Sequence, residues 1–140
     1  MDIVDIFNIS GSGLTAERYR LGTIASNLAN AHSIGKPGTE AYQRQSPVFS
    51  AEPIDAFGDQ FDRALATVKL DEVSSSQGAE QLVFDPTNKY ADPEGYVHYP
   101  DINVLHEMAD MMTATRAYEA NANVVDTTRD LALRALDIGR

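Results

Sequence analysis

The stretch VLHEMADMMTATRAYEANANVVDTTRDLALRALDI, residues 104–138, decides the fold that the sequence predicts, because it is long and contains neither proline nor glycine. Its apolar and small residues repeat at intervals of three and four, the spacing of one helix face. They are Val104, Met108, Met111, Thr115, Tyr118, Ala122, Val125, Ala132 and Leu136, with a gap at Arg129. A helix of about 50 Å with so narrow a stripe is typical of a seam against other helices.

A second helical pattern lies near the start of the sequence. It consists of Phe7, Leu14, Leu21 and Leu28, seven residues apart, with Ile24 and Ala25 in the intervening turn. No proline occurs before Pro37. We predict a helix over residues 3–30 with a bend at Gly11 and Gly13, because each glycine costs about 1 kcal/mol relative to alanine in a helix.

The segment between the two helical patterns has a different composition. Residues 35–100 contain all six prolines. They also contain four short β-prone pieces, namely YQRQSPVF (42–49), ATVKLDEV (66–73), QLVFDP (81–86) and GYVHYP (95–100). We therefore predict an α+β fold with a small β-rich antiparallel insert between two terminal helices.

Composition and charge exclude several classes of protein. The 140 residues are 43% hydrophobic, the net charge is −10, and there is no cysteine. An acidic chain is unsuited to nucleic acids and anionic membranes, and without thiols there is no disulfide or thiolate chemistry. The first ten residues, MDIVDIFNIS, lack the basic and apolar regions of a secretory signal peptide, and no apolar run is long enough to cross a bilayer.

Two motifs resemble patterns that bind a dinucleotide or a zinc ion, but both are incomplete. Gly11, Gly13 and Ala16 fit the dinucleotide-binding pattern G-x-G-x-x-A, yet no apolar strand precedes them and no acidic residue follows about 20 positions later. His106 and Asp110 lie four residues apart, as zinc ligands on a helix do, but the second histidine is missing. An exposed first helical turn explains Glu107 and Asp110 without a metal. We predict no enzyme activity, cofactor, metal or small-molecule substrate.

Asparagines and small residues are frequent in both helical patterns. Asparagine forms helices poorly, and an amide in an apolar seam fixes the register of two helices because it must find a partner there. Asn27, Asn30, Asn121 and Asn123 are candidates for this role, and the alternative is that they face water.

The same segments resemble the bacterial flagellar axial proteins, and among them the rod proteins of the basal body. The resemblance rests on SGSGLTAERYRLGTIASNLANA (10–31), Asp85-Pro86, the Gly95-Tyr96-Val97 to Tyr99-Pro100 passage, and RAYEAN (116–121). It covers residues 1–31 and 82–140. His32-Ser33 stand where Asn-Thr is usual, and His106 stands where an acid is usual.

This resemblance implies that the ends and the middle of the chain have different roles. Residues 1–31 and 101–140 would form an inner coiled-coil domain that stacks helically with neighbours, and residues 32–100 would face outward. It also implies that the chain is a structural subunit of the drive shaft, in the periplasmic space, exported by the flagellar type III apparatus without a cleaved signal. The implied partners are copies of the chain, other proximal and distal rod proteins, and the adaptor between the rod base, the export gate and the MS ring.

The predicted assembly interface combines both helical patterns. It comprises Leu14, Leu21, Ile24, Asn27, Leu28, Asn30, Met108, Met111, Tyr118, Asn121, Val125 and Leu136. Two helices with narrow stripes cannot bury every apolar side chain between them, so neighbouring subunits are expected to cover the rest. The alternative function is a free-standing coiled-coil adaptor that binds a partner through its acidic insert.

Overall fold

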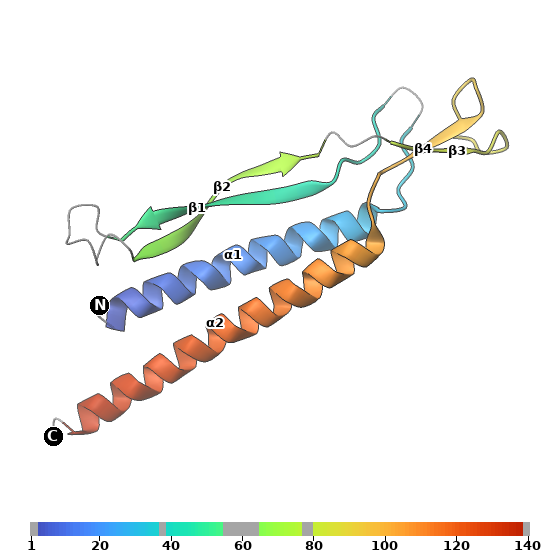
Figure 1. Cartoon of the computed structure of the whole chain (residues 1–140). Coiled ribbons are helices and arrows are strands. Elements are labelled where there is room, and N and C mark those ends of the chain that lie inside the picture. Colours follow the sequence, from blue (N-terminus) through green and yellow to red (C-terminus); the bar gives the residue numbers. More distant parts are fainter. Residues whose placement is uncertain (1–2, 37–38, 55–64, 77–79, 139–140) are drawn as a thin grey trace.

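The computed structural model describes residues 3–36, 39–54, 65–76 and 80–138. Its elements are α1 (Ile3–Asn30), β1 (Gln45–Pro53), β2 (Ala66–Ser75), β3 (Gln81–Phe84), β4 (Tyr96–Tyr99) and α2 (Val104–Ile138), as Figure 1 shows. The predicted α+β fold is confirmed, with long helices at the two ends and antiparallel strands between them. No helix in the described ranges has the length and apolar character that crossing a membrane requires.

Helix α1 lies between two layers. On one side it runs antiparallel to α2, with Asn27 close to Glu107 at one end and Gly13 close to Asn121 farther along. On another side it packs against the ribbon of β1 and β2, which follows the helix along most of its length (Figure 1). Helix α1 is therefore the element that holds the described structure together.

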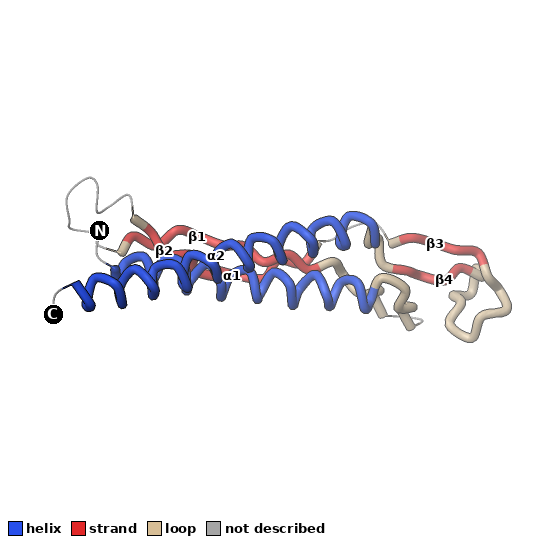
Figure 2. Tube along the Cα trace, turned by 90° about the horizontal axis from the view of Figure 1, so that it is seen from below, coloured by secondary structure: helices blue, strands red, loops and turns tan. Residues whose placement is uncertain are grey.

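The insert forms two separate two-stranded sheets. Strands β1 and β2 pair antiparallel from Gln45 opposite Ser75 to Pro53 opposite Ala66, with an irregularity between Val48 and Phe49. Strands β3 and β4 form a shorter antiparallel ladder that projects beyond the ends of the helices (Figure 2).

The structure contains one continuous helix through Gly11 and Gly13, where the sequence predicted a bend. A Cβ atom on Gly13 would lie 3.0 Å from the side-chain nitrogen of Asn121, so glycine allows α2 to approach closely. On another side the Ser12 hydroxyl accepts a hydrogen bond from the backbone N–H of Val68 at 3.0 Å. Packing against both neighbours outweighs the low helix propensity of the glycines.

The residues of α2 that are buried most deeply are shifted by one position from the predicted stripe. Glu107, Ala114 and Thr128 are buried, whereas Met108 and Thr115 of the predicted stripe are exposed. The predicted members Met111, Tyr118, Val125 and Ala132 lie half-buried beside this line. Small and hydrogen-bonded residues occupy the centre because the helices approach closely there, which a search for large apolar residues does not reveal.

Candidate assembly interface

A cluster of polar side chains joins α1, α2 and the start of β1, and we call it the polar junction. It consists of Asn27, Tyr42, Arg44, Gln45 and Glu107. Two of its members, Asn27 and Glu107, are only 1% exposed. Buried polar groups of this kind are tolerated because each finds hydrogen-bond partners.

Asn27 is the centre of the polar junction. Its side-chain nitrogen donates to the Gln45 carbonyl at 2.8 Å, and its side-chain oxygen accepts from the Gln45 N–H at 2.9 Å. The nitrogen also donates to Glu107 at 3.1 Å, and the oxygen accepts from the Tyr42 hydroxyl at 3.1 Å. One amide thus fixes the first residue of β1 and the first turn of α2 to α1.

The Glu107 carboxylate binds the Arg44 guanidinium as well as the Asn27 amide. Arg44 Nε donates to Glu107 Oε1 at 2.7 Å, and the Arg44 guanidinium lies 3.7 Å from Asp110. Burial, and then the negative charge of Glu107, raise the pKa of Tyr42, so its hydroxyl keeps the proton that it donates to Asn27. The expectation that Glu107 lies in an exposed first turn is wrong, because the loop before β1 covers it.

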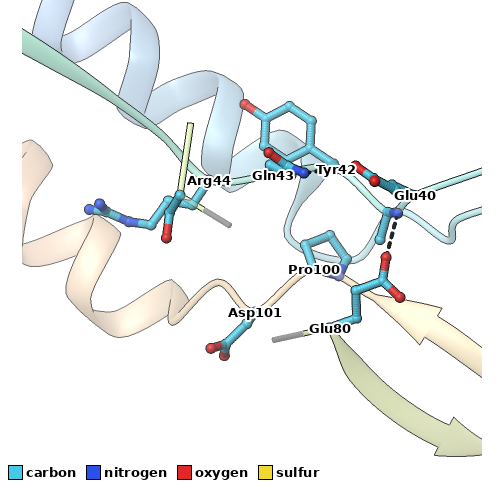
Figure 3. A pocket seen from close by; sticks show the side chains of 9 residues that line it. Glu40, Tyr42, Gln43, Arg44, Glu80, Pro100 and Asp101 are labelled. Atoms are coloured by element: carbon cyan, nitrogen blue, oxygen red, sulfur yellow. Dashed lines mark hydrogen bonds between the residues drawn. The ribbon is translucent and has the colours of Figure 1, made fainter. Parts of the chain in front are cut away.

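A second polar cluster lies next to the junction, and we call it the histidine clamp. His98 on β4 contacts the carboxylates of Glu80 and Asp92, and Glu80 also accepts from the backbone N–H of Ala41 at 2.9 Å. Figure 3 shows this last bond at the edge of a cavity of about 380 Å³. The bond to Glu80, supported by Asp92, raises the pKa of His98, and the bonds from Ala41 and His98 lower that of Glu80. The clamp joins the segment before β1 to β4.

Exposed apolar side chains lie along α2, from Met108 beside the polar junction to the C-terminal end of the helix. A hollow of about 490 Å³ between the helices is lined mainly by Leu28 and three methionines, with a polar rim; the full lining is Leu28, Met108, Met111, Met112, Thr115, Arg116 and Glu119. Near the C-terminal end of α2, Leu136 and Ile138 are 69% and 87% exposed. Apolar patches of this kind mark sites of protein association.

The predicted interface residues fall into three groups. Ile24 and Asn27 are buried inside the chain, and Met108 and Leu136 are exposed. The remaining eight are half-buried, namely Leu14, Leu21, Leu28, Asn30, Met111, Tyr118, Asn121 and Val125. Asn123, a further candidate for setting register, is exposed.

The members of the polar junction that the sequence did not single out are Tyr42, Arg44 and Gln45, and Glu107 was expected to face water. No spacing signals them, because they come from distant segments that meet only in the folded chain. The Gly11 to Ala16 segment lies inside α1 and does not form a strand-to-helix turn of the dinucleotide type. In the described ranges, no group of three or more acidic, histidine or cysteine side chains is placed to hold a metal ion.

Comparison with known proteins identifies the family of this chain. Residues 7–32 match the family described as "Flagella basal body rod protein", and residues 94–138 match "Flagellar basal body rod FlgEFG protein C-terminal". Over the full length of both chains, the sequence is 40% identical to the flagellar basal-body rod protein FlgC of Salmonella typhimurium and 39% identical to that of Escherichia coli O157:H7. The chain belongs to the FlgC family. It is also 39% identical to FlgC of Aquifex aeolicus, covering 98% of this chain and 97% of the relative.

Membership of the FlgC family confirms the resemblance to flagellar rod proteins that the sequence suggested. The chain is a structural subunit of the flagellar basal-body rod, and a free-standing adaptor is not favoured. For a FlgC-family chain, the functional site is a set of contact surfaces. The exposed faces of α1 and α2 are the candidates for them.

Proposed function

We propose that this FlgC-family chain forms part of the proximal rod by packing the exposed faces of α1 and α2 against neighbouring rod subunits. The predicted interface residues on these faces would contact copies of the chain, other proximal and distal rod proteins, and the adaptor at the base of the rod. The assembled rod would transmit torque as a drive shaft. The chain would act in the periplasmic space after export by the flagellar type III apparatus.

The observation that carries this proposal is the exposure of large apolar residues on α2. Met108, Met112 and Leu136 are each at least half exposed, and they lie on a helix whose deepest contacts within the chain are small or polar. Exposed apolar area of this extent is unfavourable in water, and association with other subunits removes it from solvent. The negative charge of the chain is consistent with protein partners and disfavours nucleic acid.

Two substitutions on exposed interface residues test the proposal. We expect Met108→Asp and Leu136→Asp to leave the folded subunit intact, because both side chains face solvent, but to prevent its incorporation into rods and abolish swimming. The measurement is the amount of the chain in purified basal bodies, together with motility, in cells that lack the natural copy. Circular dichroism of each purified variant checks the fold.

Thr127→Asp is the matched control, since Thr127 is also exposed on α2 but is not apolar. This variant is expected to assemble and to support swimming. Normal rods with both Met108→Asp and Leu136→Asp would contradict the proposal.

A further inference from the structure

The outer edge of β3 carries backbone groups that no other part of the described chain satisfies. Asp85 donates its N–H to the Gly95 carbonyl, so in the alternating antiparallel pattern Leu82 and Phe84 occupy the positions whose N–H and C=O groups point away from β4. In the described ranges these outward groups have no hydrogen-bond partner. Strand β3 is therefore an open edge four residues long.

The corresponding edge of β4 is mostly covered. Tyr96 donates its N–H to the Asp92 carboxylate at 2.8 Å, and its carbonyl accepts from the Asp92 N–H at 2.8 Å. The next outward carbonyl, that of His98, accepts from the Gly35 N–H at 3.0 Å. Three of the four outward backbone groups of β4 are thus bound by the chain itself, and the exception in the described ranges is the N–H of His98.

The long ribbon also carries edge protection. On β1 the outward groups of Gln45 are bound by Asn27, and prolines without an N–H occupy the outward positions 47 and 53. On β2 the outward N–H of Val68 is bound by Ser12, and the strand carries charged residues at positions 69, 71 and 72. Prolines and charges on edge strands are the usual means of preventing pairing with other chains.

Strand β3 has none of this protection. Its sequence, Gln81-Leu82-Val83-Phe84, contains neither a charge nor a proline, and all four residues are exposed. The ladder of β3 and β4 projects beyond the helix ends (Figures 1 and 2), so another chain can reach it without meeting α1 or α2. An exposed, uncharged apolar edge favours strand addition.

We infer that β3 pairs edge to edge and antiparallel with β3 of a second copy, so that two free subunits share one four-stranded sheet. Two-stranded sheets are marginally stable in water, and a larger sheet is more stable. This inference goes beyond rod assembly, because the pairing relates two subunits by a two-fold axis and requires no other rod protein.

A second copy fits this edge because β3 is self-complementary about Val83. Leu82 of one chain stands opposite Phe84 of the other, so the outward donors and acceptors of both strands meet. Asp85 then faces Gln81, and Glu80 faces the uncharged position 86. No acid of one copy directly opposes an acid of the other, although each chain carries a net charge of −10.

A cysteine cross-link tests the register directly. The chain contains no cysteine, and Val83 opposes itself in a pair without mutual hydrogen bonds, with Cα atoms about 4.5 Å apart. This separation suits a disulfide. We expect full-length Val83→Cys, exposed to oxidised glutathione, to form disulfide-linked dimers at least about tenfold faster than Val48→Cys, because only position 83 is held against its equivalent. Val83 and Val48 are both 41% exposed, so accessibility is matched.

A proline at position 82 shows whether cross-linking results from edge pairing or from random collision. The Leu82 N–H points outward, so Leu82→Pro removes an intermolecular donor without removing a hydrogen bond to β4. In the Val83→Cys background it is expected to lower the cross-linking rate to that of Val48→Cys, whereas Leu82→Thr, which keeps the N–H, retains fast cross-linking. Circular dichroism checks that each variant is folded.

Equal rates for the cysteines at positions 83 and 48, or fast cross-linking that survives Leu82→Pro, would overturn the inference. These results leave the proposed rod contacts on α2 untouched, since Met108 and Leu136 are tested separately by incorporation into rods. Conversely, normal rods with Met108→Asp and Leu136→Asp would contradict the rod proposal without changing the cross-linking result.

Discussion

The two ends of the helix pair differ in what they bury. At the polar junction, Asn27 and Glu107 are 1% exposed, whereas at the other end Leu136 and Ile138 are 69% and 87% exposed. Polar residues are thus buried where the chain supplies partners, and apolar residues are exposed where it does not. Burial in this subunit follows the availability of neighbours more closely than it follows polarity.

The register of the helices explains the difference. Since Asn27 lies close to Glu107 and Gly13 close to Asn121, the first described turn of α1 lies beside residues near 131 of α2. The following turns of α2 extend beyond the described start of α1, as Figure 1 shows. Their apolar side chains have little of this chain to pack against, which suits a subunit completed by its neighbours.

The substitution with the largest expected effect removes Glu107 from the polar junction. Glu107→Ala removes the carboxylate that binds Arg44 Nε at 2.7 Å and the Asn27 amide at 3.1 Å, and we expect it to lower the free energy of unfolding by about 2–3 kcal/mol. Urea denaturation monitored by circular dichroism measures the loss. Glu119→Ala, at an exposed position of the same helix, is the control, with an expected change below about 0.5 kcal/mol. Equal effects would show that the junction does not stabilise the fold.

A second change tests the centre of the same cluster. Asn27→Ala removes the amide that binds Gln45, Tyr42 and Glu107, and the expected loss is about 2 kcal/mol. Asn30→Ala removes only an exposed bond to the carbonyl of Ser26 and is expected to cost less than about 0.5 kcal/mol. A similar cost for the two asparagines would remove the distinction between the junction and the rest of α1.

Gly11 and Gly13, in the middle of the helix pair, differ in how closely other atoms approach them. A Cβ atom on Gly11 meets no atom within 4 Å, so Gly11→Ala is expected to stabilise the subunit by about 0.5–1 kcal/mol through helix propensity. Gly13→Ala is expected to gain less, because the Asn121 side chain must move to admit the methyl group. Thermal unfolding of the two variants measures the difference, and a larger gain at position 13 would contradict the close packing.

The smallest expected effect is a pH dependence at the histidine clamp. The raised pKa of His98 adds stability that is complete below its ordinary value of 6.5 and is lost as the pH rises through the folded value. The lowered pKa of Glu80 adds stability that is present above 4.5 and is lost as the pH falls through its folded value. The clamp therefore contributes most between about pH 4.5 and 6.5.

His98→Gln checks this dependence. The stability difference between the natural chain and His98→Gln is expected to shrink as the pH rises from 6 to 9, as measured by denaturation at each pH. A difference that stays constant over this range would show that protonation of His98 does not stabilise the fold.

Much of this architecture follows from local sequence. Proline-free helical spacing, by seven near the start and by three and four near the end, predicted both helices. The β-prone pieces such as QLVFDP and GYVHYP predicted the strands, because hydrophobic periodicity and turn residues act over short distances. The motifs shared with flagellar rod proteins, such as RAYEAN, indicated the family. These features depend only on residues near one another in the chain.

Only the tertiary structure decided which residues occupy the centre of the seam and which edge stays open. The loop before β1 brings Arg44 over Glu107, and Asn121 lies against Gly13, so polar and small residues occupy the centre of the seam while much of the predicted stripe is half-buried beside it. Likewise, Asp92 and Gly35 cover most of the edge of β4, whereas that of β3 stays open in the described ranges. Such outcomes depend on contacts between distant segments, whose partners no local pattern specifies.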